Sequence, residues 1–232
     1  MNIKVISSGS SGNAYIVNDG DTTILLDCGV PVGDIQKACN FNLNGIDCCL
    51  LSHEHGDHSK SANKLAKRGI NIVMHPETAK AIHAEGHRIR TLKNKESIEV
   101  GTFKIMAFDL VHDCPNLGFL LLSMKTHEKL VYITDTAYCR YKFKNLTHIM
   151  IEANNDKDIL RQNAKDMVIP ESLRGRIIET HMEINTTIEF LKANYSKALQ
   201  RVYLLHLSDR NSNEIEFYRK AAEATGTEVV VC

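Results

Sequence analysis

One short run of polar residues has the composition of a metal site: Ser52-His53-Glu54-His55-Gly56-Asp57-His58. Imidazoles and carboxylates are side chains that bind divalent metals. They cannot all face one ion along a regular strand or helix, but a tight turn can aim His53 and His55 at one metal, and Asp57 and His58 at a second. The spacing H-x-H-x-D-H therefore predicts a two-metal site rather than an ordinary solvated turn.

The motif needs a strand before it and a helix after it. Residues 46–51 are apolar nearly throughout, which is typical of a strand covered on both faces, and they lead directly to His53. Residues 59–68 carry apolar side chains on one side and lysines on the other, which predicts a helix. Residues 70–74 predict the next strand. The motif is thus expected at the carboxyl end of a buried strand.

The remaining pattern predicts two sheets. Three strands at 3–6, 14–17 and 22–27 form an antiparallel meander, and residues 31–39 form a helix. The later predicted elements are a hairpin at 97–111 that turns near Gly101, strands at 118–123, 130–134, 147–152 and 202–205, and two helices that open with capping boxes, Thr186 with Glu189 and Asn213 with Glu216. The simplest architecture is an α/β (α+β) protein of two mixed sheets packed together with helices outside, in one domain over residues 1–232.

The motif H-x-H-x-D-H resembles the signature of the metallo-β-lactamase fold hydrolases, which implies an αββα sandwich. Further residues match the family in order, each at the end of an apolar strand: Asp27, His112, Asp135 and His206. By this resemblance one metal is held by His53, His55 and His112. The other is held by Asp57, His58 and His206, Asp135 bridges both ions, and Asp27 orients motif histidines as an outer partner.

Nitrogen and oxygen ligands without a thiolate favour two divalent zinc ions, with manganese and iron as chemical alternatives. Asp135 disfavours the lactamases that have cysteine at the corresponding position. His55 disfavours the iron-dependent flavoproteins of this fold, which typically have glutamate there. The resemblance thus narrows the candidate functions to those of metal-dependent hydrolases whose metal ligands are nitrogen and oxygen atoms only.

Within the fold, the chain resembles the YycJ/WalJ group, whose members are associated with 5′-to-3′ DNA exonuclease activity. The residues that carry this resemblance lie outside the metal motifs, in the segments 8–13, 151–156, 173–182 and 206–211. Two departures from the group concern the flanks of His181, where Thr180 and Glu183 replace the expected glycine and serine. A third is Asn155, which stands where the group usually has histidine.

The resemblance implies a phosphodiesterase, and a DNA exonuclease in particular. Two cations about 3.5 to 4 Å apart would share a water and lower its pKa, which places a hydroxide in line with the scissile phosphorus. Asp57 and His181 are the predicted catalytic residues, with His181 as general acid or phosphate contact; the alternative for His181 is a surface or capping role. The predicted substrate-binding residues are Ser10, Ser11, Asn13, Asn154, Arg210 and Asn211.

Two other functions remain open. The same metals could hydrolyse a small ester, a thioester or a cyclic phosphodiester. Only 70 residues separate Asp135 from His206, which leaves no room for a large inserted RNA clamp but does not exclude small substrates. A non-catalytic nucleic-acid or regulatory module that keeps the fold is disfavoured because every metal-ligand position is filled.

The composition sets the remaining limits. There are 28 Lys+Arg and 28 Asp+Glu, so the formal net charge is zero, and the attraction of DNA has to come from bound metal and from local basic patches such as Arg140, Lys142 and Lys144. Affinity for long DNA is therefore expected to be modest and sensitive to salt. No apolar run suits a signal peptide or a membrane span, so a cytoplasmic location is expected. The seven cysteines are scattered and predict reduced, mostly buried thiols.

Overall fold

The computed structural model describes residues 1–232, and its strands form one sheet of six strands and one of seven. The strands up to residue 123 are β1 (Asn2–Ser7), β2 (Ala14–Asn18), β3 (Thr23–Leu26), β4 (Cys48–Leu50), β5 (Asn71–Met74), β6 (Ile89–Thr91), β7 (Ser97–Val100), β8 (Phe103–Leu110) and β9 (Asn116–Ser123). The helices in this part are α1 (Val32–Ala38), the 3₁₀ helix η1 (Leu43–Gly45), α2 (Gly56–Ser59), α3 (Ala62–Lys67) and α4 (Pro76–Ala81).

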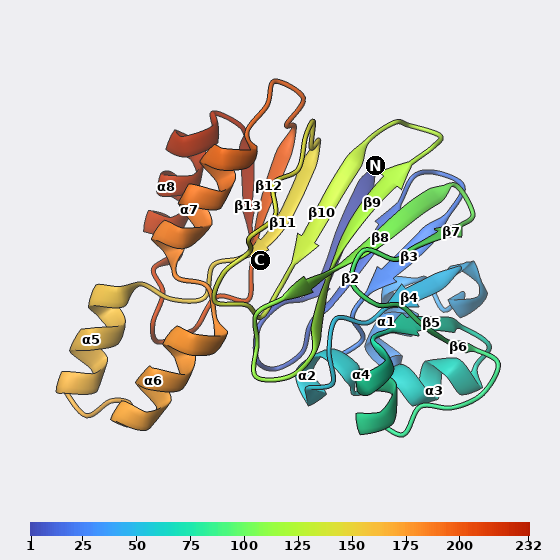
Figure 1. Ribbon diagram of the computed structural model, residues 1–232, viewed down its shortest axis with the longest axis horizontal. Helices are drawn as coiled ribbons and strands as arrows, with labels where there is room; N and C mark the ends of the chain where they lie inside the picture. The colour runs from blue at the N-terminus through green and yellow to red at the C-terminus, as the bar shows by residue number, and fades with distance from the viewer. The chain divides into compact units, whose positions relative to one another are not determined.

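The later part of the chain contains four strands and four helices (Figure 1). They are β10 (Lys129–Ile133), β11 (His148–Glu152), α5 (Lys157–Lys165), α6 (Glu171–Thr180), α7 (Ile184–Asn194), β12 (Arg201–Leu205), α8 (Glu214–Thr225) and β13 (Glu228–Val231). The first sheet has the strand order β1-β2-β3-β4-β5-β6 and the second β13-β12-β11-β10-β9-β8-β7. No helix is both long and apolar enough to cross a membrane.

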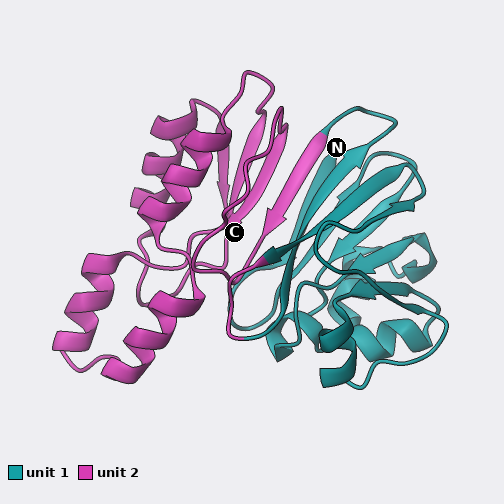
Figure 2. Cartoon of the chain, in the orientation of Figure 1, with its two compact units in different colours: residues 1–109, 114–128 teal, residues 110–113, 129–232 magenta.

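The chain divides into two compact units (Figure 2). Unit 1 comprises Met1–Asp109 and Cys114–Glu128, and unit 2 comprises Leu110–Asp113 and Lys129–Cys232. The single domain over residues 1–232 stays a prediction.

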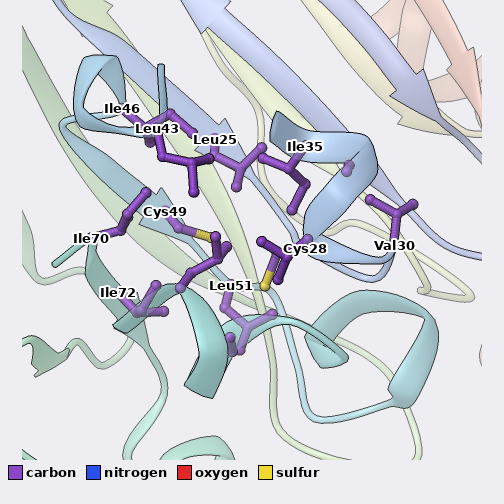
Figure 3. Packing of buried hydrophobic residues seen from close by; sticks show 14 of the residues in the cluster. Leu25, Cys28, Val30, Ile35, Leu43, Ile46, Cys49, Leu51, Ile70 and Ile72 are labelled. Carbon is purple, nitrogen blue, oxygen red and sulfur yellow. The ribbon is translucent and has the colours of Figure 1, made fainter. Parts of the chain in front are cut away.

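The first sheet of unit 1 is mixed. Strands β1, β2 and β3 pair antiparallel, as the predicted meander requires, and β3 to β6 pair parallel. Parallel neighbours need crossovers, which α1 to α4 supply. Under the helices lies an apolar cluster in which Leu25, Cys49 and Ile72 of the strands meet Ile35 of α1 (Figure 3). Burial of such side chains, about 1.5–3 kcal/mol each, fixes the strand ends that carry the motif.

The second-sheet strands of unit 1 include the predicted hairpin. Strands β7 and β8 pair antiparallel around Gly101, whose φ is 53°. A side chain at Gly101 would collide with Thr22, because its Cβ would lie 2.1 Å from the Thr22 hydroxyl oxygen. The turn therefore needs glycine for both its conformation and its close contact.

A buried carboxylate joins the β2–β3 turn to the later strands of unit 1. Asp19 accepts hydrogen bonds of 2.6 Å from the hydroxyls of both Ser123 and Thr102. Burial by itself raises the pKa of Asp19, but these bonds and backbone N–H groups of Thr22 and Asp21 outweigh it and lower the pKa to about 2. Asp19 is thus a charged anchor of unit 1.

The sheet strands of unit 2, β10 to β13, pair parallel with one another. Every residue of β11 is buried, which is expected of a parallel strand covered on both faces. Helix α8 packs against β13 and α7, and it ends at Gly226 with a left-handed φ of 60°. Because parallel strands end at the same edge, the residues that follow β10, β11 and β12 lie together.

Several predicted elements need correction. The helix expected at 59–68 is two short helices, α2 and α3. Thr186 does not cap α7, because the helix already begins at Ile184 with Glu183 as N-cap. The second capping site is confirmed, since the Asn213 side chain accepts a hydrogen bond from the Glu216 N–H. Helices α4, α5 and α6 and the strands β6 and β13 were not anticipated, because their short or polar segments lack a clear apolar period.

Candidate metal and catalytic site

The motif loop, residues 52–58, gathers three imidazoles at the end of β4 in unit 1. The ring of His53 lies 4.7 Å from that of His55 and 4.3 Å from that of His58, measured between centroids. His53 and His58 are buried, whereas His55 and Asp57 are half-buried. Helix α2 begins at Gly56, so the chain turns within the motif and brings the three imidazole rings close together.

Asp27, directly after the end of β3, holds this loop through hydrogen bonds. Its carboxylate is fully buried and accepts hydrogen bonds from the N–H of Ser52 at 2.7 Å, from the hydroxyl of Ser52 at 2.9 Å, and from Nδ1 of His58 at 2.7 Å. Because Nδ1 donates to Asp27, Nε2 of His58 is the nitrogen with a lone pair for a metal. The φ of Asp27 is 54°, a left-handed conformation that costs roughly 1 kcal/mol or more outside glycine.

The segment after Asp27 packs tightly against the motif loop. A Cβ on Gly29 would lie 1.6 Å from the carbonyl oxygen of Asp57, so only glycine fits. The N–H of Cys28 donates to the carbonyl of His58 at 2.8 Å. The backbone of this segment thus fixes the motif loop without using a ligand side chain.

Asn13 fixes a second turn against the same loop. Its backbone N–H donates to the Asp57 carbonyl at 2.7 Å, and its side-chain nitrogen lies 3.1 Å from Nε2 of His58. The neighbouring Ser10 and Ser11 are exposed, while Asn13 is fully buried. Of the three residues expected to bind substrate here, only the serines face solvent.

Cys114 is a site residue that sequence reasoning missed. Its sulfur lies 3.9 Å from Nε2 of His55, and the donor atoms of His53, His55 and Cys114 all lie within 4.8 Å of one another. All seven cysteines are free thiols and four of them are buried, as predicted. No regular spacing pointed to Cys114, because it approaches the motif through the fold.

Unit 2 holds a second group of ligand-type residues, here called the strand-end cluster: Asp135, Glu152, His181 and His206. Their donor atoms all lie within 4.8 Å of one another. Asp135 follows β10, Glu152 ends β11 and His206 follows β12, so the parallel sheet itself brings three of them together. Asp135 and His206 both have left-handed backbones, with φ of 48° and 54°, which is the kind of local strain that clusters at functional sites.

Glu152 is the centre of this cluster. Its side chain is fully buried, and Oε1 accepts a hydrogen bond of 2.6 Å from Nδ1 of His181. Oε2 accepts from the N–H groups of Thr136 at 3.0 Å and Met182 at 3.1 Å. The ring of His181 also stacks on that of His206, with centroids 5.3 Å apart and planes 12° apart.

Glu152 lies in the segment 151–156 that resembles the YycJ/WalJ group, but the sequence analysis predicts no role for it. A signal for it existed, because Glu152 ends a wholly apolar strand in the way that His53, Asp135 and His206 follow theirs. With Nδ1 of His181 bound to Glu152, Nε2 of His181 is the nitrogen that can give or take a proton; this side chain is 19% exposed.

His112 lies in unit 2, beside the strand-end cluster. Nδ1 donates to the carbonyl of Thr180 at 3.0 Å, and the ring lies 5.9 Å from that of His181. Burial lowers the pKa of His112 from its ordinary value, and the nearby carboxylates of Asp135 and Asp113 offset this only in part. A neutral imidazole, which is the form that binds metals, is therefore favoured at His112.

The residues expected near His206 divide into two kinds. Asn154 is buried, and its side-chain nitrogen donates to the His206 carbonyl at 2.9 Å and lies 3.2 Å from Nδ1 of His206. Asn211 is also buried and bonds to Ser208 and Asn163 within the fold. Arg210 is exposed. Asn154 therefore holds His206, and only Arg210 faces solvent.

The donor chemistry of the two groups suits divalent cations. Imidazole nitrogens and carboxylate oxygens dominate both, and Asp27 fixes the tautomer of His58 as an outer partner does in metal sites. Unit 1 contributes His53, His55, Asp57 and His58 to the predicted ligand set, and unit 2 contributes His112, Asp135 and His206. The side chains present thus fit the metals that the motif implies.

Comparison with known proteins decides the family. Residues 22–207 match the family model described as "Beta-lactamase superfamily domain". The chain belongs to this superfamily. This beta-lactamase superfamily protein is similar to exodeoxyribonuclease WalJ of Streptococcus pneumoniae, with 26% identity over 90% of this chain and 82% of that protein. It is similar also to exodeoxyribonuclease YycJ of Bacillus anthracis, with 27% identity over 93% of this chain and 86% of that protein.

Solved structures of other proteins show the same fold. The metallo-β-lactamase fold protein YhfI from Bacillus subtilis has a TM-score of 0.76 at 17% identity and covers 99% of this chain and 95% of its own. Human tRNase Z, short form, has a TM-score of 0.67 at 18% identity, with 100% and 96% covered. The predicted fold class and family are confirmed, and this superfamily protein is a metal-dependent hydrolase.

Proposed function

We propose that this protein is a DNA exonuclease that cleaves phosphodiester bonds in the 5′-to-3′ direction. The observation that carries the proposal is the similarity to two proteins named exodeoxyribonuclease, which extends over 90% of the chain or more. The aligned span includes the motif loop and the strand-end cluster. A cytoplasmic location stays an expectation.

Two zinc ions are the proposed cofactors. His53, His55 and His112 would hold one ion, Asp57, His58 and His206 the other, and Asp135 would bridge them. When bound, such a pair supplies Lewis acidity and an activated water. What supports the assignment is the donor set: nitrogen and carboxylate ligands dominate, and Asp27 directs Nε2 of His58 away from itself.

Asp27 and Glu152 position the reactive groups. Asp27 stabilises one tautomer of His58 at 2.7 Å, so the ring presents the same nitrogen in every turnover. Glu152 does the same for His181, because its side-chain oxygen accepts from Nδ1 at 2.6 Å and leaves Nε2 as the nitrogen that exchanges a proton. His181 then delivers a proton from Nε2 to the departing oxygen.

Substrate contacts are assigned to the exposed members of the predicted set, Ser10, Ser11 and Arg210. Asn13 and Asn154 act through the histidines that they contact, His58 and His206. Because the net charge is zero, binding of long DNA depends on few contacts and weakens with salt.

The test is to purify the protein, measure its bound metal, and incubate it with 5′-labelled duplex DNA, single-stranded DNA and a chromogenic phosphodiester, alongside Asp57→Ala. The proposal expects DNA cleavage that the substitution abolishes, together with a loss of bound metal. Cleavage of the small diester without any cleavage of DNA would reject the nuclease function and favour a small-molecule hydrolase. Full activity in Asp57→Ala would reject the metal assignment.

A further inference from the structure

Unit 2 contains a pocket whose walls include none of the proposed metal-binding or catalytic residues. It has a volume of about 190 Å³ and is formed by the segment that follows Asp135 together with one face of α7. Its principal walls, here called the aromatic pocket, are Tyr138, Arg140, Tyr141, Lys142, Met182 and Phe190. The pocket is smaller than the roughly 300 Å³ at which pockets for drug-sized ligands begin, so it suits one flat ring rather than a large molecule.

The walls combine flat and cationic side chains. Tyr138 is 56% exposed, so much of its ring faces solvent and is accessible to a ligand. Arg140 and Lys142 are exposed as well. The guanidinium carbon of Arg140 lies 5.9 Å from the ring centroid of Tyr141. Aromatic faces next to two cations, with Glu189 as the acidic wall residue, fit a ligand that is both flat and anionic.

The aromatic pocket is tied directly to the strand-end cluster. Glu152, which holds His181, also accepts hydrogen bonds from the N–H groups of Thr136 and Met182. Met182 lies in the pocket wall, and the Thr136 hydroxyl donates to the carbonyl of Tyr138 at 3.0 Å. Tyr138 follows Asp135 by three residues, which spans at most about 11 Å of chain.

The pocket segment is also held at its far end. The N–H of Phe143 donates to the side-chain oxygen of Asn194 on α7 at 2.6 Å, and the ring of Phe143 lies 6.4 Å from that of Phe190. The segment from Thr136 to Phe143 is thus fixed at both ends. A site fixed in this way binds a ligand without first ordering its own backbone.

We propose that the aromatic pocket binds the base of the nucleotide next to the scissile phosphate, stacked on Tyr138, while Arg140 and Lys142 contact the neighbouring backbone phosphates. This inference rests on the proposed nuclease function and names its substrate subsite. Stacking on tyrosine tolerates any base, because every base has a flat face. The pocket therefore positions the DNA without a preference for its sequence.

The test compares two sugar phosphates of which only one carries a base, thymidine 5′-monophosphate and deoxyribose 5-phosphate, each titrated into the metal-loaded protein by calorimetry. We expect the nucleotide to bind about tenfold more tightly than the sugar phosphate. Tyr138→Ala should remove this difference, and Tyr138→Phe should keep it. The matched control is Tyr195→Ala, a 52% exposed tyrosine outside the pocket, which should also keep it.

Equal binding of the two probes by the unsubstituted protein would overturn the inference. So would a base preference, meaning tighter binding of the nucleotide than of the sugar phosphate, that survives in Tyr138→Ala. DNA cleavage is measured on the same preparations. Cleavage without a base preference rejects the pocket alone, whereas a base preference without cleavage supports the pocket and rejects the exonuclease function. The two proposals can therefore fail separately.

Discussion

Replacing Glu152 by glutamine probes the pairing that we propose for proton transfer. Glutamine keeps the size of the side chain and one oxygen, which can still accept from the N–H groups of Thr136 and Met182. Its amide nitrogen then faces Nδ1 of His181, which no longer has a carboxylate 2.6 Å away. The substitution removes the negative charge and reverses the hydrogen bond, while the fold around it is kept.

The expected magnitude follows from that one contact. A hydrogen bond to a charged group contributes about 1.5–3 kcal/mol, which corresponds to roughly a 10- to 150-fold loss of kcat on DNA. His181→Ala removes the proton donor and should cost about 10²- to 10⁴-fold. The free energy of unfolding should fall by no more than about 2 kcal/mol in Glu152→Gln, because its backbone acceptors remain satisfied.

The assay compares DNA with thymidine 5′-p-nitrophenyl phosphate. Nitrophenolate departs without a proton, so both variants should lose far more activity on DNA than on the chromogenic ester. Equal losses on the two substrates, with unfolding curves like that of the unsubstituted protein, would refute a role of Glu152 and His181 in protonating the leaving group.

Three further predictions concern stability and reactivity. Asp19→Asn should lower the free energy of unfolding by about 1–2 kcal/mol at pH 7, with the exposed Asp21→Asn as control. Because the folded pKa of Asp19 lies near 2, below the ordinary value of about 3.9, this contribution is present above pH 4 and disappears as the pH falls from 4 to 2. Urea titrations in which the difference between variant and parent stays constant down to pH 2 would contradict the prediction. Gly29→Ala should lower the free energy of unfolding by about 3 kcal/mol and weaken metal binding, because the new Cβ collides with the backbone of Asp57. The control is Gly33→Ala in α1, where no atom lies within 4 Å of the new Cβ and the change should be neutral or stabilising. Equal unfolding midpoints of the two variants would show that the motif loop can move aside. Burial raises the pKa of Cys48 to about 12 and that of Cys139 to about 11, so both thiols should resist iodoacetamide at pH 7.5 until the protein is unfolded, and rapid labelling of the native protein, detected by mass spectrometry, would contradict this.

The sequence predicted those parts of the fold in which burial dictates the residue pattern. The strand at 46–51 is apolar because it is covered on both faces, and glycines separate the strands of the antiparallel meander that precedes it. By contrast, α5 and α6 lie in a polar stretch whose apolar residues include the 90% exposed Met167, so no apolar face marked them. The prediction that Thr186 caps α7 is wrong because the pattern of a capping box does not reveal at which residue the helix begins; α7 begins at Ile184, with Glu183 as its N-cap.

The candidate site was predictable as a set of residue types and less so as a set of contacts. The rule that ligands follow apolar strands located Asp135 and His206, and applied once more it would have pointed to Glu152. Cys114 could not be found in this way, because it comes near His55 through the fold and not through a local pattern. Asn13 and Asn154 were expected at the substrate, but their buried side chains contact histidines, which a sequence does not show.

The most direct test of the central claim follows the first product released from DNA. Duplex DNA carrying a label at either the 5′ or the 3′ end is mixed with the metal-loaded protein in a single turnover, and aliquots are stopped and separated by length. A metal-dependent 5′-to-3′ exonuclease releases the 5′ label first, as a short product, and a chelator stops the release. Absence of any release from metal-loaded protein, or first release of the 3′ label, would contradict the proposed function.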